Sequence, residues 1–438
     1  MAQSHYQECT KSELDLFAAP HLQTSIEKGY WVECFPVSNL TDSGPIEFNV
    51  PGSGEEYGDL RQAWLYVKAK VVKANGDNLE EATDKVGPVN LFLQSLFSQV
   101  DVLLNDKVIS QSTNTNPYRA MMSTLLTYGS DAKTSQMSCE LFYKDTAGRM
   151  DVVDPTAASP NAGLKTRYNF VKGSTTVEMA GPLHVDLFYQ DRLLLNGVGL
   201  RLRLNRSKNA FCLLSAVVGA NYKVTISHAS LFVRKVKVFA DTFVAQEEAL
   251  QHAPAYYPTT RTECKALSIP AGNMSFTPDD VFLGQIPKRI VLGLVENTAF
   301  NGAYNKNPFN FQHFKATHVG VFVNGESMPM KALQLNFDQN QYLMGYMSLF
   351  AGTGKLYHDQ GNAITREEYP KGYTLYALDL SPDLSAGPHM SAIKQGNLRL
   401  GLQFAEGLPC TVTCIIFAEF DSLIEIDANR NVTYNWSN

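Results

Sequence analysis

The residue types that bind metal ions occur in this sequence, but their spacing does not bring them together. Strands commonly hold a metal through a His-x-His pair, because side chains two residues apart lie on the same face of a strand. None of the nine histidines forms such a pair. His313 and His318 are five residues apart, and an odd spacing places side chains on opposite faces of a strand. We interpret both as loop or strand-edge histidines and predict no metal-binding residues.

The seven cysteines are an odd number and are scattered along the chain, which favours reduced thiols over a disulfide framework. Cys410 and Cys414, in the stretch CTVTC, are four residues apart and would share one face of a strand. A zinc site would need further ligands, and the surrounding sequence supplies none. We interpret the pair as two buried apolar thiols.

Motifs for phosphate binding and catalysis are incomplete. The stretch GTGK at 352–355 lacks the upstream glycine of a phosphate loop, and Leu356 stands where Ser or Thr would bind magnesium. Neither HExxH nor GxSxG occurs. The carboxylate pairs Asp279-Asp280 and Glu367-Glu368 have polar, turn-like surroundings typical of solvated surface. We predict no catalytic residue, no cofactor and no enzyme; the alternative of a glycanase-like hydrolase needs two carboxylates across one cleft, which the sequence cannot place.

The charge balance argues against a protein that coats nucleic acid. The formal net charge is −6, whereas nucleic-acid binding depends on Lys and Arg neutralising phosphates. Two strand-like stretches are basic, with Arg201 and Arg203 in one and Arg234, Lys235 and Lys237 in the other. We favour an exposed strand face or a subunit contact over a nucleic-acid groove, and we predict no direct sequence-specific nucleic-acid binding.

The N-terminus is too polar for a signal peptide, and no run of eighteen apolar residues occurs, so we predict a soluble chain made in the cytosol without membrane insertion. The Asn-x-Ser/Thr sequons would then be chance matches without glycans. They begin at Asn39, Asn205, Asn273, Asn431 and Asn435.

The sequence repeats itself in five places, in the same order. VDVLLNDK at 100–107 resembles VGVFVNGE at 319–326, and YRAMMSTLL at 118–126 resembles YLMGYMSLF at 342–350. Three further pairs follow, each weak alone. They are FYKDTAG at 142 with LYHDQGN at 356, LRLRLN at 200 with LRLGLQ at 398, and KVTIS at 223 with TVTCI at 411. Five ordered matches indicate an internal duplication.

Each copy has the pattern of an antiparallel sandwich. Alternating apolar stretches such as RQAWLYVKAKVV (61–72) have the two-residue period of half-buried strands. VDVLLNDKVIS predicts a hairpin that turns at Asn105-Asp106, and the segments at 118–126 and 342–350 predict short helices. With no βαβ alternation, we predict an all-β chain of two tandem eight-stranded antiparallel jelly rolls with short helices and long loops.

The predicted domains are an N-terminal arm (1–40), a first jelly roll (41–240), a linker (241–262), and a second jelly roll with the C-terminal tail (263–438). The arm is too apolar for a solvated tail, so we expect it to pack under an assembly or against a neighbouring subunit. Deleting residues 1–30 should then weaken assembly more than folding. We also expect the long loops at 129–181 and 297–315 to contact neighbouring chains.

Three long stretches resemble a known family. DLFAAPHLQTSIEKGYWVECFPVSNLTDSGPIEFNVPGSGEEYGDL (15–60) resembles the opening of the major capsid proteins of Polinton (Maverick) elements and adintoviruses. YYPTTRTECKALSIPAG (256–272) and NPFNFQHFKATHVGVFVNGESMP (307–329) resemble the second half of the same family. The resemblance runs from about residue 15 to about residue 420. Cys34 stands where the family pattern leads us to expect an aromatic residue.

The resemblance implies a structural, hexon-like double jelly-roll protein that forms pseudo-hexagonal homotrimers tiling an icosahedral viral shell. It implies a place in the virion capsid, with synthesis in the host cytoplasm and assembly in the host nucleus. Expected partners are neighbouring capsomers, penton proteins and minor capsid proteins. The alternative is a tandem jelly-roll lectin or receptor-binding spike, for which aromatic loops such as AYNKNPFNF (303–311) would suit sugar stacking.

Overall fold

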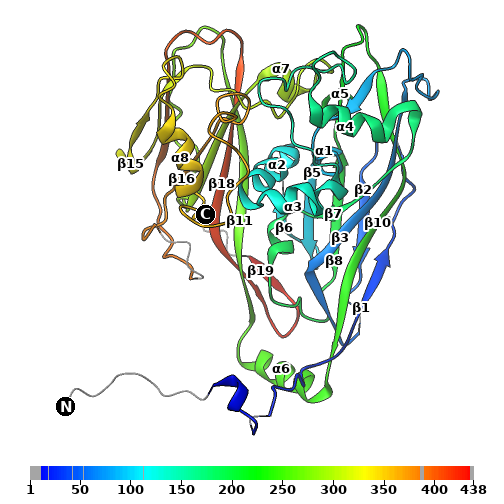
Figure 1. Cartoon of the computed structure of the whole chain (residues 1–438). Coiled ribbons are helices and arrows are strands. Elements are labelled where there is room, and N and C mark those ends of the chain that lie inside the picture. The colour runs from blue at the N-terminus through cyan, green and yellow to red at the C-terminus, as the bar shows by residue number, and fades with distance from the viewer. Residues whose placement is uncertain are drawn as a thin grey trace.

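The computed structural model describes residues 11–17, 19–41, 43–52, 54–111, 113–384 and 389–434. Asn435, the last of the five sequon positions, lies outside the described residues, as do Cys9 and part of the predicted arm. The chain forms two β-sandwiches side by side, with short helices between them (Figure 1).

The first sandwich is built from two four-stranded antiparallel sheets. Its strands are β1 (Ile26–Cys34), β2 (Ile46–Val50), β3 (Glu56–Lys73), β5 (Phe97–Leu104), β6 (Lys107–Gln111), β7 (Val177–Pro182), β8 (Leu200–Arg206) and β10 (Tyr222–Val238). Sheet 1a has the order β1-β10-β3-β7, and sheet 1b has the order β2-β8-β5-β6. A small pair, β4 (Val86–Pro88) and β9 (Leu213–Ser215), lies outside these sheets.

The second sandwich repeats this plan. Its strands are β11 (Ala255–Ile269), β12 (Ser275–Phe276), β13 (Arg289–Glu296), β14 (Ala316–Val323), β15 (Glu326–Gln334), β16 (Leu375–Asp379), β17 (Leu398–Phe404) and β18 (Val412–Ile426). Sheet 2a has the order β11-β18-β13-β16, to which β19 (Val432–Tyr434) adds by pairing with β18, and sheet 2b has the order β12-β17-β14-β15.

The two halves have the same topology. If the eight main strands of each half are numbered along the chain, both halves order them 1-8-3-6 in one sheet and 2-7-4-5 in the other. Two facing antiparallel sheets connected in this way form a jelly roll. The predicted fold, two tandem eight-stranded antiparallel jelly rolls, is confirmed.

The repeated phrase of the sequence forms the same hairpin in both halves. Asn105 and Asp106 turn from β5 into β6, and Asn324 and Gly325 turn from β14 into β15. All four residues have positive φ, between 43° and 88°. Positive φ at both central residues is the requirement of a two-residue hairpin turn that matches strand twist, and Asn, Asp and Gly tolerate it best.

The helices gather in the connections. The two predicted helical segments correspond to α2 and α8. The helices of the described residues are α1 (Phe92–Ser95), α2 (Asn116–Thr127), α3 (Ser130–Thr134), α4 (Ala162–Val171), α5 (Asn209–Cys212), α6 (Ala240–His252), α7 (Asn297–Asn301) and α8 (Leu343–Ala351), with 3₁₀ turns η1 (Ser12–Leu14), η2 (Gln136–Glu140), η3 (Lys172–Ser174) and η4 (Asp186–Tyr189).

Two segments differ from the predicted arm and linker. Residues 26–34, expected in the arm, form β1, which pairs with β10 at the edge of sheet 1a. The predicted linker is ordered structure, because α6 fills its first half and β11 begins at Ala255. In both segments apolar and polar residues do not alternate cleanly along the sequence, although burial alternates in the structure over residues 30–34 and 255–259. The division into domains at residues 40, 240 and 262 stays a prediction.

Candidate assembly surface

The two jelly rolls contact each other through helix α2 of the first half and sheet 2a of the second half. The side chain of Met122 on α2 points at Gly293 in β13, where an added Cβ would lie 3.1 Å from the Met122 Cε atom. The hydroxyl of Thr115, at the start of α2, donates a hydrogen bond to the carbonyl of Cys264 in β11 at 3.2 Å. The outer face of sheet 2a is therefore covered by the other half of the same chain.

The burial of residues along β13 is consistent with helix α2 covering the outer face of sheet 2a. Residues 290–295 are buried without interruption, so both faces of the strand are out of contact with solvent. An uninterrupted apolar run is expected of a strand that is covered on both sides. Aromatic rings add to the contact, because Tyr118 on α2 stacks on Phe300 with ring centroids 5.5 Å apart and meets the edges of Phe309 and Phe311.

The buried carboxylate of Asp145 joins the two halves at a second place. It accepts hydrogen bonds from Arg167 at 2.8 Å, from Asn161 at 2.9 Å and from Asn307 at 3.0 Å. The hydroxyl of Tyr373 donates to the Asp145 carbonyl at 2.6 Å. Asn307 and Tyr373 belong to the second half, so this polar cluster connects the two jelly rolls.

The long loops bind within the chain. Residues 129–181 reach the second half through Lys133, which donates to the carbonyl of Asn362 at 2.6 Å, and through Lys144, which pairs with Glu368 at 2.5 Å. Residues 297–315 reach the first half through Asn307 and through Tyr304, which donates to the carbonyl of Tyr222 at 2.9 Å. In the described chain both loops therefore connect the two halves. The contacts with neighbouring chains that we expect from the sequence stay a prediction.

The corresponding sheet of the first half, sheet 1a, has an open outer face. Inward residues of β3 such as Leu65 and Val67 are buried, while the residues between them are only partly buried. The outward side chains form an aromatic face, which we define as Trp31, Phe35, Trp64, Tyr66, His228 and Phe232. Trp64 stacks on Phe232 at 4.0 Å, and Trp31 meets Trp64 edge to face at 6.2 Å.

The aromatic face remains substantially exposed in the single chain. Trp31 has 47% of its surface exposed and Phe35 has 60%. Large exposed aromatic groups that contact one another are typical of a protein–protein interface rather than of ordinary surface.

Helix α8 is the second open apolar feature. In the repeat of the sequence it corresponds to α2, but where nearly all of α2 is buried, α8 exposes Leu343 (45%) and Met344 (52%). Its inner side packs on the edge strand β16, where the Ser348 hydroxyl accepts a hydrogen bond from the Ala377 amide at 3.3 Å. Figure 1 shows α8 on one side of the molecule and β1, β10 and β3 on the opposite side.

A polar cavity of about 490 Å³ lies beside the contact of α2 with sheet 2a. Its charged side chains are mostly matched in pairs. Arg119 binds Asp186 at 2.5 Å, Lys288 binds Asp421 at 2.7 Å, and Arg289 binds Glu419 at 3.0 Å. Because both signs are balanced there, the cavity offers no clear preference for an anion or a cation.

The residues considered for chemistry in the sequence do not converge. His313 stacks on Phe337 at 4.1 Å, and burial lowers its pKa, while His318 lies in β14. Cys414 is buried in β18, and burial raises its pKa to about 12; Cys410 lies before that strand and is half-buried. In the described part of the chain, no three His, Cys, Asp or Glu side chains cluster in a way that could hold a metal ion.

Two of the remaining sequence candidates, Lys355 and Glu368, make contacts with other parts of the chain. Lys355 of the GTGK stretch donates to the Thr127 carbonyl at 2.5 Å. Glu368 binds Lys144, as given above.

Within the described ranges, no helix is long and apolar enough to cross a membrane.

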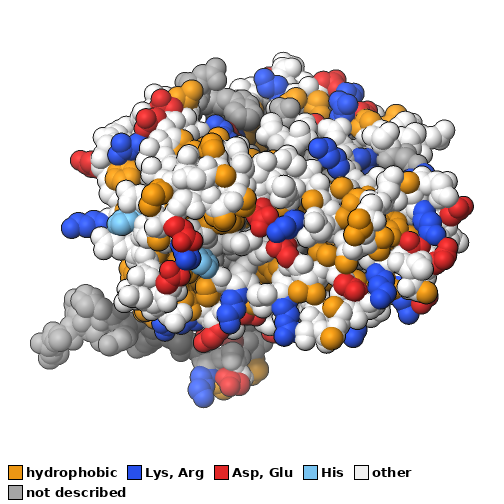
Figure 2. All heavy atoms as spheres, turned by 90° about the horizontal axis from the view of Figure 1, so that it is seen from above, with side chains coloured by type: hydrophobic (Ala, Val, Ile, Leu, Met, Phe, Trp, Pro, Cys, Tyr) orange, Lys and Arg blue, Asp and Glu red, His pale blue; other side chains and the backbone are white. Residues whose placement is uncertain are grey.

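The basic strands are ion-paired with neighbouring strands. Arg201 pairs with Asp106 at 3.0 Å, Arg234 with Asp59 at 2.9 Å, and Lys237 with Glu27 at 2.9 Å. Arg203 lies 3.4 Å from Glu47, and Lys235 is partly buried, which lowers its pKa. On the face shown in Figure 2, acidic and basic side chains are interspersed and form no field of one sign.

Comparison with sequence models of protein families finds no match. Among curated proteins, an uncharacterised protein of Caenorhabditis elegans is 24% identical over 425 residues, which cover 94% of this chain and 98% of that protein.

Solved structures with the same fold come from viral capsids. A chain of the Sputnik virophage has a TM-score of 0.64 at 13% identity, with 98% of this chain and 93% of that chain covered. The Faustovirus major capsid protein has a TM-score of 0.57 at 10% identity, with 93% and 92% covered. The mavirus major capsid protein has a TM-score of 0.50 at 13% identity, with 99% and 95% covered. The chain therefore has the double jelly-roll fold found in viral major capsid proteins.

Proposed function

We propose that this chain is a structural major capsid protein that forms pseudo-hexagonal homotrimers tiling an icosahedral shell. The observation that carries the proposal is that equivalent surfaces of the two halves are covered in one half and open in the other. Sheet 2a is covered by α2, whereas the equivalent sheet 1a is open, and α8, the equivalent of α2, is also open. A second copy can place its α8 on the aromatic face and so repeat the contact that already joins the two halves.

Such a contact is head-to-tail, because the open sheet and the open helix are different surfaces on opposite sides of the chain (Figure 1). Head-to-tail contacts either close into rings or extend into filaments. Three chains contribute six similar jelly rolls, and a ring of six similar blocks has a nearly hexagonal outline that packs without gaps. Obligate contacts of this kind typically bury upwards of ~2,000 Å².

The test is the mass of the purified chain by light scattering on a sizing column. We expect three times the chain mass of 48.5 kDa, independent of dilution over the measured range. Trp31→Asp and Met344→Asp change the two proposed surfaces separately, and each should release monomers. The control is Val218→Asp, which places the same charge at a fully exposed valine that belongs to neither surface.

A folded wild-type chain that stays monomeric would contradict the proposal. The same holds if both surface variants keep the trimer mass as Val218→Asp does. Circular dichroism of each variant separates loss of assembly from loss of folding.

The structure does not support the aromatic loop at 303–311 as a sugar-binding site, which was the main sequence feature in favour of a lectin or spike. Phe309 and Phe311, in the aromatic loop proposed for sugar stacking, are buried against Tyr118, so their rings are out of reach of a sugar. Electron microscopy of concentrated protein tests the alternative, since a spike would form neither cages nor hexagonal sheets.

The narrower parts of the proposal rest on sequence resemblance. We propose that the chain belongs with the Polinton (Maverick) and adintovirus major capsid proteins, that penton and minor capsid proteins are its partners, and that shells assemble in the host nucleus. Expression of the fluorescently tagged chain in cultured animal cells tests the last point. Trimers that remain in the cytoplasm would count against it.

A further inference from the structure

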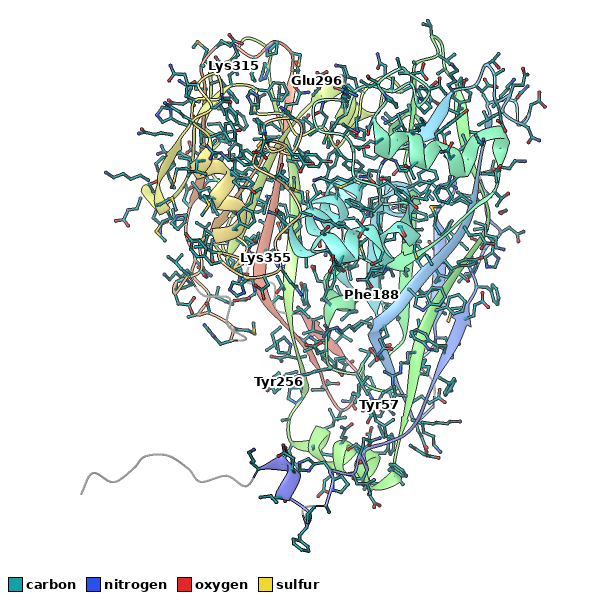
Figure 3. The ribbon with its side chains drawn as sticks, in the orientation of Figure 1. Tyr57, Phe188, Tyr256, Glu296, Lys315 and Lys355 are labelled. Carbon is teal, nitrogen blue, oxygen red and sulfur yellow. The ribbon has the colours of Figure 1, made fainter. Side chains whose placement is uncertain are left out.

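An apolar groove of about 580 Å³ lies between α6 and the start of β11, at the end of the molecule where β1 begins. Its walls are Leu193, Leu195, Ala249, Leu250 and the rings of Tyr256 and Tyr257. Figure 3 shows Tyr57 and Tyr256 on its two sides, from β3 and β11. The Tyr57 hydroxyl, in a residue that lines the groove, is buried and has no hydrogen-bond partner among the described residues.

The N-terminal segment at the same end carries apolar side chains that nothing covers. Leu14 is 67% exposed, Leu16 76% and Phe17 97%. Three large apolar groups so close together in an exposed segment are costly in water, and they call for a partner surface. The chain's own segment is at the same end of the molecule as α6 in the view of Figure 1, and none of its residues lines the groove.

We propose that residues 11–17 of a second copy of this chain dock in the groove between α6 and β11. The match is chemical, because Leu14, Leu16 and Phe17 fit apolar walls. It is also electrostatic, because the segment carries Glu13 and Asp15 and the rim of the groove carries the exposed Arg192. The inference rests on the proposed assembly and adds a contact that the aromatic face and α8 do not make.

The segment is long enough for this exchange. Phe17 and the start of β1 at Ile26 are nine positions apart, and an extended chain over nine positions spans roughly 30 Å. A jelly roll of about 200 residues has a radius of gyration of roughly 16 Å, so the segment can reach across most of one block.

The first experiment measures binding of a fluorescent peptide of residues 11–22 to the full chain. The chain carries Leu16→Asp and Phe17→Asp so that its own segment does not compete. We expect binding that Ala249→Trp weakens at least tenfold, because the new ring fills the groove. Ala245→Trp is the matched control, since Ala245 is exposed on the same helix but does not line the groove.

A peptide that does not bind overturns the proposal, and so does equal binding to the two tryptophan variants. The trimer mass of each variant is measured in parallel. Trimers without peptide binding would end this inference and leave the proposed function standing, whereas a wild-type monomer would end the proposed function.

The second experiment tests whether docking occurs between chains. One chain carries Phe17→Cys and another carries Ala249→Cys, with the exposed Cys139 replaced by Ser in both. After mixing and mild oxidation, we expect a disulfide-linked pair of chains on a non-reducing gel, and none when Ala245→Cys replaces Ala249→Cys. If a single chain carrying both cysteines cross-links only internally, docking between copies is excluded.

Discussion

Loss of the buried Asp145 carboxylate should strongly destabilise the fold. In the described part of the chain, this carboxylate is the negative charge that pairs with the fully buried guanidinium of Arg167, at 2.8 Å. Asp145→Ala leaves that guanidinium without a counter-charge, which typically destabilises a protein by about 3–5 kcal/mol. Urea unfolding measures the difference.

Asp191→Ala is the control for this substitution. Asp191 pairs with Arg61, and both side chains are mostly exposed, so we expect a change of only about 0–1 kcal/mol. Equal effects of the two substitutions would mean that the Asp145 cluster does not join the halves as described.

Lys133 should make stability depend on pH. Burial, together with the positive charges of Lys144 and Lys355, lowers its pKa to about 7, whereas an unfolded lysine has a pKa near 10.4. Above pH 7 the unfolded chain therefore binds more protons at this position, and the free energy of unfolding rises with pH. The slope from Lys133 is on the order of 1 kcal/mol per pH unit within this window.

The measurement is urea unfolding at pH 7.0 and pH 8.5, for the natural chain and for Lys133→Met. Methionine does not titrate, so the difference in slope between the two chains isolates the lysine from tyrosines and other groups. Parallel slopes would show that Lys133 is not buried between the halves.

At the scale of elements, Gly293 in β13 sets how closely α2 approaches sheet 2a. A Cβ there would lie 2.8 Å from Leu375 Cδ2 and from Phe311 Cδ1, both inside normal contact distance. Overpacking of this kind usually costs about 1–3 kcal/mol, so Gly293→Ala should lower the midpoint of unfolding. Gly361→Ala is the control, because nothing lies within 4 Å of its Cβ position and the change should be nearly neutral.

Several elements were predictable because local chemistry fixes them. The hairpins at Asn105-Asp106 and Asn324-Gly325 follow from residues that tolerate positive φ between alternating strands. Helices α2 and α8 follow from compact apolar segments at matching places in the repeat. The strand alternation around Leu65 and Val67 follows from a sheet with one covered face.

Other elements depend on distant partners and could not be predicted. β1 is an edge strand, and its partner β10 lies about two hundred positions further along the chain, so its own residues do not indicate the pairing. The proposed assembly surface could not be predicted either, because it also depends on residues far apart in the sequence. Trp64 in β3 and Phe232 in β10 each have apolar neighbours in the sequence, and only the pairing of the two strands brings the rings into a stacked pair. Whether a loop contacts its own chain or a neighbour also depends on the placement of the two halves, which the sequence does not contain.

At the scale of the whole molecule, the boundary between arm and sandwich decides what a truncation does. The deletion of residues 1–30 suggested by the sequence would cut into β1, so it would confound folding with assembly. Deleting residues 1–22 avoids this, because Gln23 remains, and its side chain accepts hydrogen bonds from the amides of Ser25 and Ile26 at the start of β1.

Deletion of residues 1–22 and deletion of residues 1–34 should therefore behave differently. Deletion of residues 1–22 removes Leu14, Leu16 and Phe17, which are exposed in the single chain, so we expect an unchanged melting temperature and weaker assembly at low concentration. Deletion of residues 1–34 also removes β1 and leaves β10 as an exposed sheet edge, which typically promotes aggregation. That chain should melt at a lower temperature and precipitate. If the shorter deletion lowered the melting temperature while trimers of the surviving protein formed normally, the N-terminal segment would belong to the core of its own chain.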